Sequence, residues 1–180
     1  VDMLLNIELP QLRSVDIGNI RKIKALLAII STEVPMLVDI TKLATLTGIA
    51  RTTMLAYLQY LHEAKLIRLL YSDDLSVKKM QKPDKILMEN TNLLQALSLQ
   101  VPNIGTMRET FFCNQLGYTH QVEYNKRGDY LIDHKYVFEI GGKAKDGKQV
   151  ANMENAYIAS DECDYPIGNK LPLWLFGLMY

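Results

Sequence analysis

The sequence has no uninterrupted apolar run that approaches the roughly 18 to 20 residues of a membrane-spanning helix. It has only two cysteines, Cys113 and Cys163, which lack the short spacing of metal ligands, and a chain of this size does not need disulfide bonds. A glycine-rich phosphate-binding loop ending in Lys-Ser or Lys-Thr is also absent. We therefore expect a cytoplasmic protein without a membrane segment, in which this chain does not itself hydrolyse a nucleotide.

Charge of one sign is not in excess, because 20 basic and 20 acidic side chains give a net charge of zero. The chain as a whole offers no positive field that would attract a polyanion. Binding of nucleic acid would therefore require a local basic patch. The length of 180 residues allows one or two small domains, because single cores commonly serve about 100 to 200 residues.

Helical periodicity dominates the first third of the chain. Apolar residues recur at helical spacing over 20–30, and a second, shorter helix is indicated over 39–46. Thr47-Gly48 supplies a turn, and a third helix follows to about Lys65, with Thr52 or Thr53 as its cap. This order of helices is typical of a helix-turn-helix.

Two expected strands, 66–71 and 85–88, follow the third helix and form a wing. A helical connector covers 89–100, and the break at 102–105 marks a domain boundary. We accordingly divide the chain into a leading segment, 1–19, a winged helix-turn-helix domain, 20–101, and a C-terminal α/β module, 102–180. The expected fold class is α+β.

The C-terminal module combines helices and strands. We expect a helix over 106–116, three strands over 121–124, 130–132 and 136–140, and hairpin turns at 126–128 and 133–135. A further helix is expected over 148–158, and 171–178 is expected to be a buried strand or a packed tail.

The front of the third helix is the candidate DNA-reading element, because such helices contact base edges with their N-terminal residues. The residues concerned are Arg51, Thr52, Thr53 and Tyr57. Lysines of the wing suit phosphate contacts; they are Lys78, Lys79, Lys82 and Lys85. The alternative is a packing module inside a larger protein, with these lysines on a solvated loop diluted by neighbouring aspartates.

The candidate catalytic residues are Asp129, Glu139 and Lys143, with Glu109 as an additional acid. Two carboxylates, Asp129 and Glu139, can hold Mg²⁺, and a lysine can position the attacking water in phosphodiester hydrolysis. A lysine two positions after Glu139 would share its face about 7 Å away, but Gly141 stands there. Lys143 is about 13 Å along a regular strand, unless a bulge at Gly141-Gly142 shortens that distance. The alternative is an acid and a glycine turn kept for structure.

The order of these segments resembles the C-terminal region of a group of bacterial and archaeal AAA-type ATPases of unknown role. In this group a winged helix precedes a restriction-endonuclease-like domain. The resemblance extends over nearly the whole chain, and the pieces that match are 40–67, 85–88, 105–109, Gly128-Asp129-Tyr130, 138–143 and 171–177. The resemblance implies a nuclease motif of Asp, then Glu, any residue and Lys, of which Asp129 and Glu139 match while Gly141 does not. It also implies that 1–19 is the remnant of an upstream ATPase lid or tail.

Three functions are consistent with the sequence. The first is a non-catalytic DNA- or protein-binding regulatory region, whose partner is DNA, an upstream ATPase domain or another protein, and which needs no cofactor. The second is a Mg²⁺-dependent nuclease that uses Asp129, Glu139, Lys143 and Glu109. The third is a transcription regulator that acts through the winged helix alone.

Overall fold

The protein has a mixed α and β architecture with two separate sheets, which agrees with the expected α+β class. The computed structural model describes residues 1–13, 15, 17–72, 82–148, 150 and 153–179. The chain folds into two compact units. Unit 1 comprises 1–69 and 85–102, and unit 2 comprises 70–84 and 103–180.

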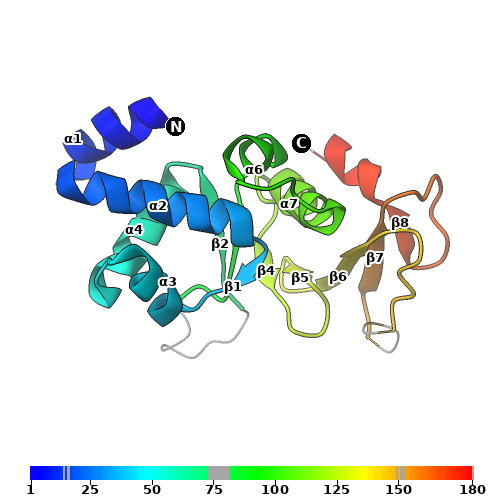
Figure 1. Ribbon diagram of the computed structural model, residues 1–180. Coiled ribbons are helices and arrows are strands. Elements are labelled where there is room, and N and C mark those ends of the chain that lie inside the picture. Colours follow the sequence, from blue (N-terminus) through cyan, green and yellow to red (C-terminus); the bar gives the residue numbers. More distant parts are fainter. Residues whose placement is uncertain (14, 16, 73–81, 149, 151–152, 180) are drawn as a thin grey trace. The chain divides into compact units, whose positions relative to one another are not determined.

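Unit 1 is mainly helical (Figure 1). Its helical elements are η1 (Leu4–Glu8, a π-helix), α1 (Leu9–Arg13), α2 (Ile17–Glu33), α3 (Ile40–Thr47), α4 (Arg51–Glu63) and α6 (Thr91–Leu97). The buried apolar face of α2 has the helical spacing seen in the sequence; its residues are Ile20, Ile23, Leu26, Leu27 and Ile30.

Local sequence sets the ends of α3 and α4. The Asp39 carboxylate accepts a hydrogen bond from the Lys42 N–H at 3.0 Å and caps α3. Gly48 then ends α3 with φ of 64°, in the left-handed region that glycine adopts without strain. The expected threonine cap of the next helix was wrong: α4 begins at Arg51 after Ala50, which makes no side-chain cap, and both threonines lie in its first turn.

A small sheet completes unit 1, with the strand order β1 (Met36–Leu37), β3 (Lys85–Met88) and β2 (Ile67–Leu70). Strands β1 and β3 are antiparallel. The sheet buries an ion pair in which Arg68 donates to Glu89 at 2.5 Å. A buried charge is costly without a partner. This pair therefore holds Glu89, the residue after β3, against Arg68 of β2.

Unit 2 is built on the five-stranded sheet β4-β5-β6-β7-β8. The strands are β4 (Val122–Tyr124), β5 (Tyr130–Ile132), β6 (Tyr136–Gly141), β7 (Ala156–Ser160) and β8 (Lys170–Pro172). The first three are antiparallel, while β6, β7 and β8 run parallel. The helical elements are α7 (Ile104–Leu116) and η2 (Leu173–Leu178, a 3-10 helix).

The sheet of unit 2 is covered on one face by α7 and η2 (Figure 1). Phe112 of α7 lies at the centre of this layer, with its ring 5.9 Å from Tyr130, 5.1 Å from Phe138 and 4.8 Å from Phe176. The other face carries a second apolar cluster that consists of Leu131, Val137, Val150, Ala156 and Ile158. Successive side chains of β5 and β6 point to opposite faces of the sheet, so neighbouring residues belong to two different cores.

The helix expected over 148–158 was wrong, because Ala156–Ser160 forms strand β7 between β6 and β8. A central strand that is buried on both faces shows no polar alternation, so its pattern does not differ from that of a short buried helix. The end of the chain is the short strand β8 followed by η2, so the expected strand or tail is divided between both.

We predict that Phe112→Ala destabilises the protein by about 3–5 kcal/mol, because it removes a fully buried ring that contacts three other aromatic rings. Urea unfolding followed by circular dichroism measures this change. Trp174→Ala serves as the control, because Trp174 is exposed in η2 and its loss should leave the midpoint nearly unchanged. Equal effects of the two substitutions would contradict the central position of Phe112.

Candidate functional site

Asp129 and Glu139 come together at the start of β5. The Asp129 N–H donates to the Phe138 carbonyl at 2.8 Å, and its Oδ2 accepts from the Ile140 N–H at 2.6 Å. Both chain neighbours of Glu139 are thus hydrogen-bonded to Asp129. Two carboxylates that the sequence separates by ten positions are thereby fixed at one place on the sheet.

Glu139 is a buried acid, with 2% of its surface exposed. Lys145 forms an ion pair with it, at 3.0 Å between Nζ and Oε1. The other oxygen, Oε2, is buried and accepts no hydrogen bond from the residues that the structure describes. The pair therefore neutralises the carboxylate and still leaves one oxygen for a ligand.

The lysine comes from a position that differs from the expected one. Lys143 is exposed, and its carbonyl accepts a hydrogen bond from the Lys170 ammonium at 2.7 Å. The Lys145 side chain instead crosses Gly141, where an added Cβ would lie 2.8 Å from Lys145 Cβ, Cγ and Cδ. Because residue 141 is glycine, there is room for the side chain of Lys145, four residues later, to reach Glu139.

The charges around Lys145 favour its ammonium form. Burial lowers the pKa of Lys145, but the hydrogen bond to Glu139 and the charges of Glu139, Asp129 and Glu109 together outweigh that effect, so the pKa is raised. The three expected acids therefore all act on this one lysine.

Glu109 belongs to the same group of side chains. It projects from α7, where its Oε2 accepts a hydrogen bond from the Tyr130 hydroxyl at 2.5 Å. Burial, followed by the nearby Cys113 and Glu109, raises the pKa of Tyr130 well above its usual range, so its hydroxyl keeps the proton that it donates. Tyr130 thereby orients the Glu109 carboxylate.

The donor set fits a hard cation such as Mg²⁺. Mg²⁺ takes oxygen ligands and is commonly held by one or two carboxylates, with water and substrate phosphate completing its shell. Asp129 and Glu139 supply carboxylate oxygens, and Glu139 Oε2 is buried without a hydrogen bond from the described residues. Within the same residues, no group of three or more His, Cys, Asp and Glu side chains has the arrangement of a metal site.

The expected DNA-contacting residues are only partly on the surface. Arg51 and Thr52 are exposed at the start of α4, and Thr53 is half-buried. Tyr57 differs from the expectation, because it is 6% exposed and packs in the core of unit 1, where a base edge could not reach it.

The wing lysines have different outcomes. Lys82 is exposed and suits a phosphate contact, whereas Lys85 is buried on β3. Lys78 and Lys79 lie outside the described residues.

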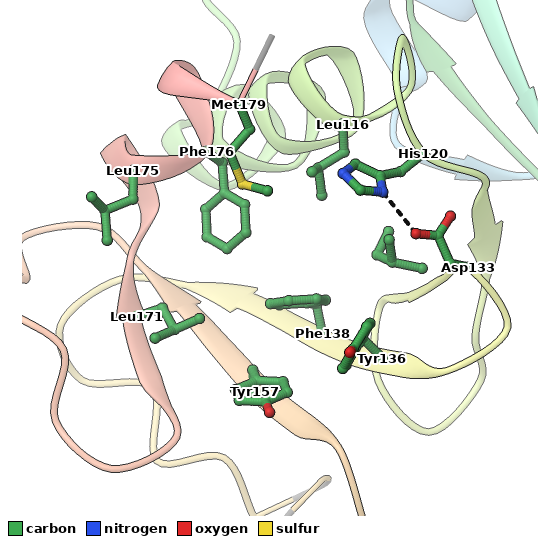
Figure 2. A pocket seen from close by; sticks show the side chains of 11 residues that line it. Leu116, His120, Asp133, Tyr136, Phe138, Tyr157, Leu171, Leu175, Phe176 and Met179 are labelled. Carbon is green, nitrogen blue, oxygen red and sulfur yellow. Dashed lines mark hydrogen bonds and ion pairs between the residues drawn. The ribbon is translucent and has the colours of Figure 1, made fainter.

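A separate cavity of about 410 Å³ lies between the sheet of unit 2 and its helical layer. Figure 2 shows Tyr136, Phe138 and Tyr157 along the sheet, with Leu116, Phe176 and Met179 facing them. Its polar side chains include Asp133, which is joined to His120 at 2.7 Å. The Gln121 backbone N–H and then the His120 ring lower the pKa of Asp133. This cavity lacks the clustered carboxylates and lysine of the first site.

Sequence reasoning missed Lys145 and this cavity. In a regular strand every second side chain shares a face, so the pattern after Glu139 points to 141 and 143. Lys145 instead lies beyond the end of β6. The feature of the sequence that could have pointed to Lys145 is the pair Gly141-Gly142. Glycine in a strand often marks a place where another group approaches the backbone closely.

Comparison with known proteins found no matching family model, curated protein or solved structure. None of the helices in the described part of the chain is both long and apolar enough to cross a membrane. The function is therefore inferred from the geometry of the site.

We predict that Lys145→Ala lowers the free energy of unfolding by about 1–3 kcal/mol, because it leaves the buried Glu139 carboxylate without its cation. Lys143→Ala is the matched control and should have little effect, since that side chain is exposed. Urea unfolding measures both variants.

The double variant Glu139→Gln, Lys145→Ala tests the cause of the loss. It should be more stable than Lys145→Ala alone, because a neutral amide needs no cation. If Lys145→Ala is equally destabilising with and without the Glu139 charge, the ion pair does not explain its effect.

Proposed function

We propose that this chain is a Mg²⁺-dependent nuclease that acts on DNA. The observation that carries the proposal is the ion pair between Lys145 and the buried Glu139, beside Asp129. Together these residues supply two carboxylates and one lysine, the groups that metal-dependent phosphodiester hydrolysis uses. We further propose that unit 2 has a restriction-endonuclease-like fold and that unit 1 is a winged helix-turn-helix.

Each residue of the site has a distinct role in this proposal. Asp129 and Glu139 would hold Mg²⁺, which when bound lowers the pKa of water and polarises a phosphoryl oxygen. Lys145 places a positive charge where negative charge develops on the attacked phosphate. Glu109, oriented by Tyr130, adds a carboxylate at the α7 side of the site.

The non-catalytic hypothesis was motivated by glycine at 141 in place of lysine, together with the neutral charge of the chain. The contact of Lys145 with Glu139 across Gly141 supports the nuclease instead. The resemblance to the C-terminal region of AAA-type ATPases is compatible with this nuclease, and an upstream ATPase domain remains a proposed partner. Two free cysteines suit the reducing cytoplasm as the place of action.

The helix-turn-helix would guide DNA in this proposal. Arg51 and Thr52 are exposed in the first turn of α4, after the turn that Gly48 makes. The N-terminal residues of such a helix are those that contact DNA. Binding through unit 1 alone would instead favour the regulator that the sequence also allows.

We predict that the protein cleaves DNA in the presence of Mg²⁺ or Mn²⁺. Asp129→Asn, Glu139→Gln and Lys145→Ala should each lower the rate by at least about 100-fold, because each removes a group that contacts the metal or the reacting phosphate. Lys143→Ala should retain the activity. Cleavage of a fluorescent duplex, followed over time, measures these rates.

A relocated lysine provides the matched control. Gly141→Lys combined with Lys145→Ala places a lysine two positions after Glu139, on the same face of β6, in the space that Lys145 has left. This variant should recover part of the activity that Lys145→Ala loses. Absence of cleavage by the wild-type protein with either metal would reject the nuclease proposal.

We also predict that Arg51→Ala weakens binding to duplex DNA and reduces the slope of log affinity against log salt by about one, because one phosphate contact is lost. Fluorescence anisotropy in Ca²⁺ measures the binding. Lys65→Ala, at an exposed position just beyond the C-terminal end of α4, is the control and should leave the slope unchanged. Identical behaviour of the two variants would remove α4 from the proposed interface.

A further inference from the structure

Positively charged side chains gather on the loop that follows Glu139. Arg108, on α7, lies against Gly142, where an added Cβ would be 3.1 Å from one terminal guanidinium nitrogen and 3.2 Å from the other. The Lys170 ammonium donates to the Lys143 carbonyl in the same loop at 2.7 Å. Lys145 donates its backbone N–H to the Gly142 carbonyl at 3.0 Å. Arg108 and Lys170 thus both contact the loop that follows Glu139.

Glycine at 142 is what lets the guanidinium lie this close to the backbone. The Cβ of any larger residue would be 3.1–3.3 Å from three guanidinium atoms, so the Arg108 side chain would have to shift slightly. Gly141 and Gly142 therefore accept two different cations in succession, Lys145 and Arg108. Of the two, Lys145 contacts the Glu139 carboxylate, at 3.0 Å.

Arg108 is held by acids that follow β7. Its Nε donates to Asp161 Oδ2 at 3.0 Å, and Glu162 Oε1 lies 3.9 Å from one terminal nitrogen, beyond hydrogen-bond length. The Arg108 side chain is 14% exposed, whereas that of Asp161 is 43% exposed. A guanidinium has five N–H donors in a planar fork, and the Asp161 bond uses the donor at Nε.

We propose that Arg108 binds a phosphate of the nucleic-acid strand, with Lys170 adding positive charge beside it, so that the strand crosses the glycine loop next to Glu139. The fork of a guanidinium matches two phosphate oxygens, and such charge-assisted pairs are stronger than neutral hydrogen bonds. This inference rests on the proposed nuclease function, and it assigns the side of the site on which the substrate backbone lies.

Because acids lie next to Arg108, the proposal predicts a specific direction of change in DNA affinity for each substitution. A bound phosphate would lie near the Asp161 and Glu162 carboxylates and would be repelled by them. Neutralising Asp161 should therefore strengthen DNA binding, whereas removing Arg108 should weaken it. If Arg108 only ties α7 to the end of β7, both changes break the same contact and should act in the same direction.

The test measures the affinity of the full chain for a labelled DNA duplex by anisotropy in Ca²⁺, where cleavage does not interfere. We expect Arg108→Ala to raise Kd about tenfold and Asp161→Asn to lower it about threefold. Lys135→Ala removes an exposed cation from the hairpin before β6 and is the matched control. Urea unfolding of each variant confirms that the fold is kept.

Two results would overturn the inference: Arg108→Ala binds DNA as Lys135→Ala does, or Asp161→Asn weakens binding as Arg108→Ala does. Cleavage in Mn²⁺ tests the nuclease proposal separately. There Arg108→Ala should raise KM with a smaller change in kcat. Opposite shifts in binding without any cleavage would retain the phosphate site and reject the nuclease, whereas cleavage with an unchanged KM would reject the phosphate site alone.

Discussion

A buried carboxylate needs a cation, and in unit 2 Lys145 is the cation that pairs with Glu139. Glu139 lies in the middle of the sheet because β6 is paired on both sides, with β5 and β7. Its charge in such a place would be strongly destabilising alone. The loop after β6 returns Lys145 over Gly141, and the other oxygen of the same carboxylate accepts no hydrogen bond from the described residues. Stability and the proposed chemistry thus depend on one ion pair.

The remaining parts of unit 2 hold this pair in place. Asp129 is hydrogen-bonded to the backbone on both sides of Glu139, and Tyr130 connects the strand after Asp129 to Glu109 on α7. Phe112 packs α7 on the sheet through the rings of Tyr130 and Phe138, and it also contacts Phe176 of η2. A rigid apolar layer on one face therefore positions polar groups at the end of the strands, which is the arrangement that precise chemistry requires.

Much of the fold was predictable from sequence because its signals were local. The spacing of Ile20 to Ile30 reported α2, and Asp39 and Gly48 marked the ends of α3. Strand β7 and the burial of Tyr57 were not predictable, because pairing on both sides and packing in the core are tertiary effects. For the proposed site, residue type was enough to suggest Asp129, Glu139 and Glu109, but Lys145 required knowledge of how the chain leaves β6.

The passage of Lys145 across Gly141 also affects how such a site can change during evolution. A lysine within a strand is bound to one register, so an insertion of one residue before it moves it to the opposite face. A lysine on a loop needs only to lie within side-chain distance of the carboxylate. Its side chain is long enough to tolerate changes in the residues between the strand and the lysine. Gly141 and Lys145 therefore form a linked pair: a side chain larger than hydrogen at 141 would become acceptable once the lysine at 145 is gone. The proposed chemistry requires an ammonium at a point in space, and more than one sequence position can supply it.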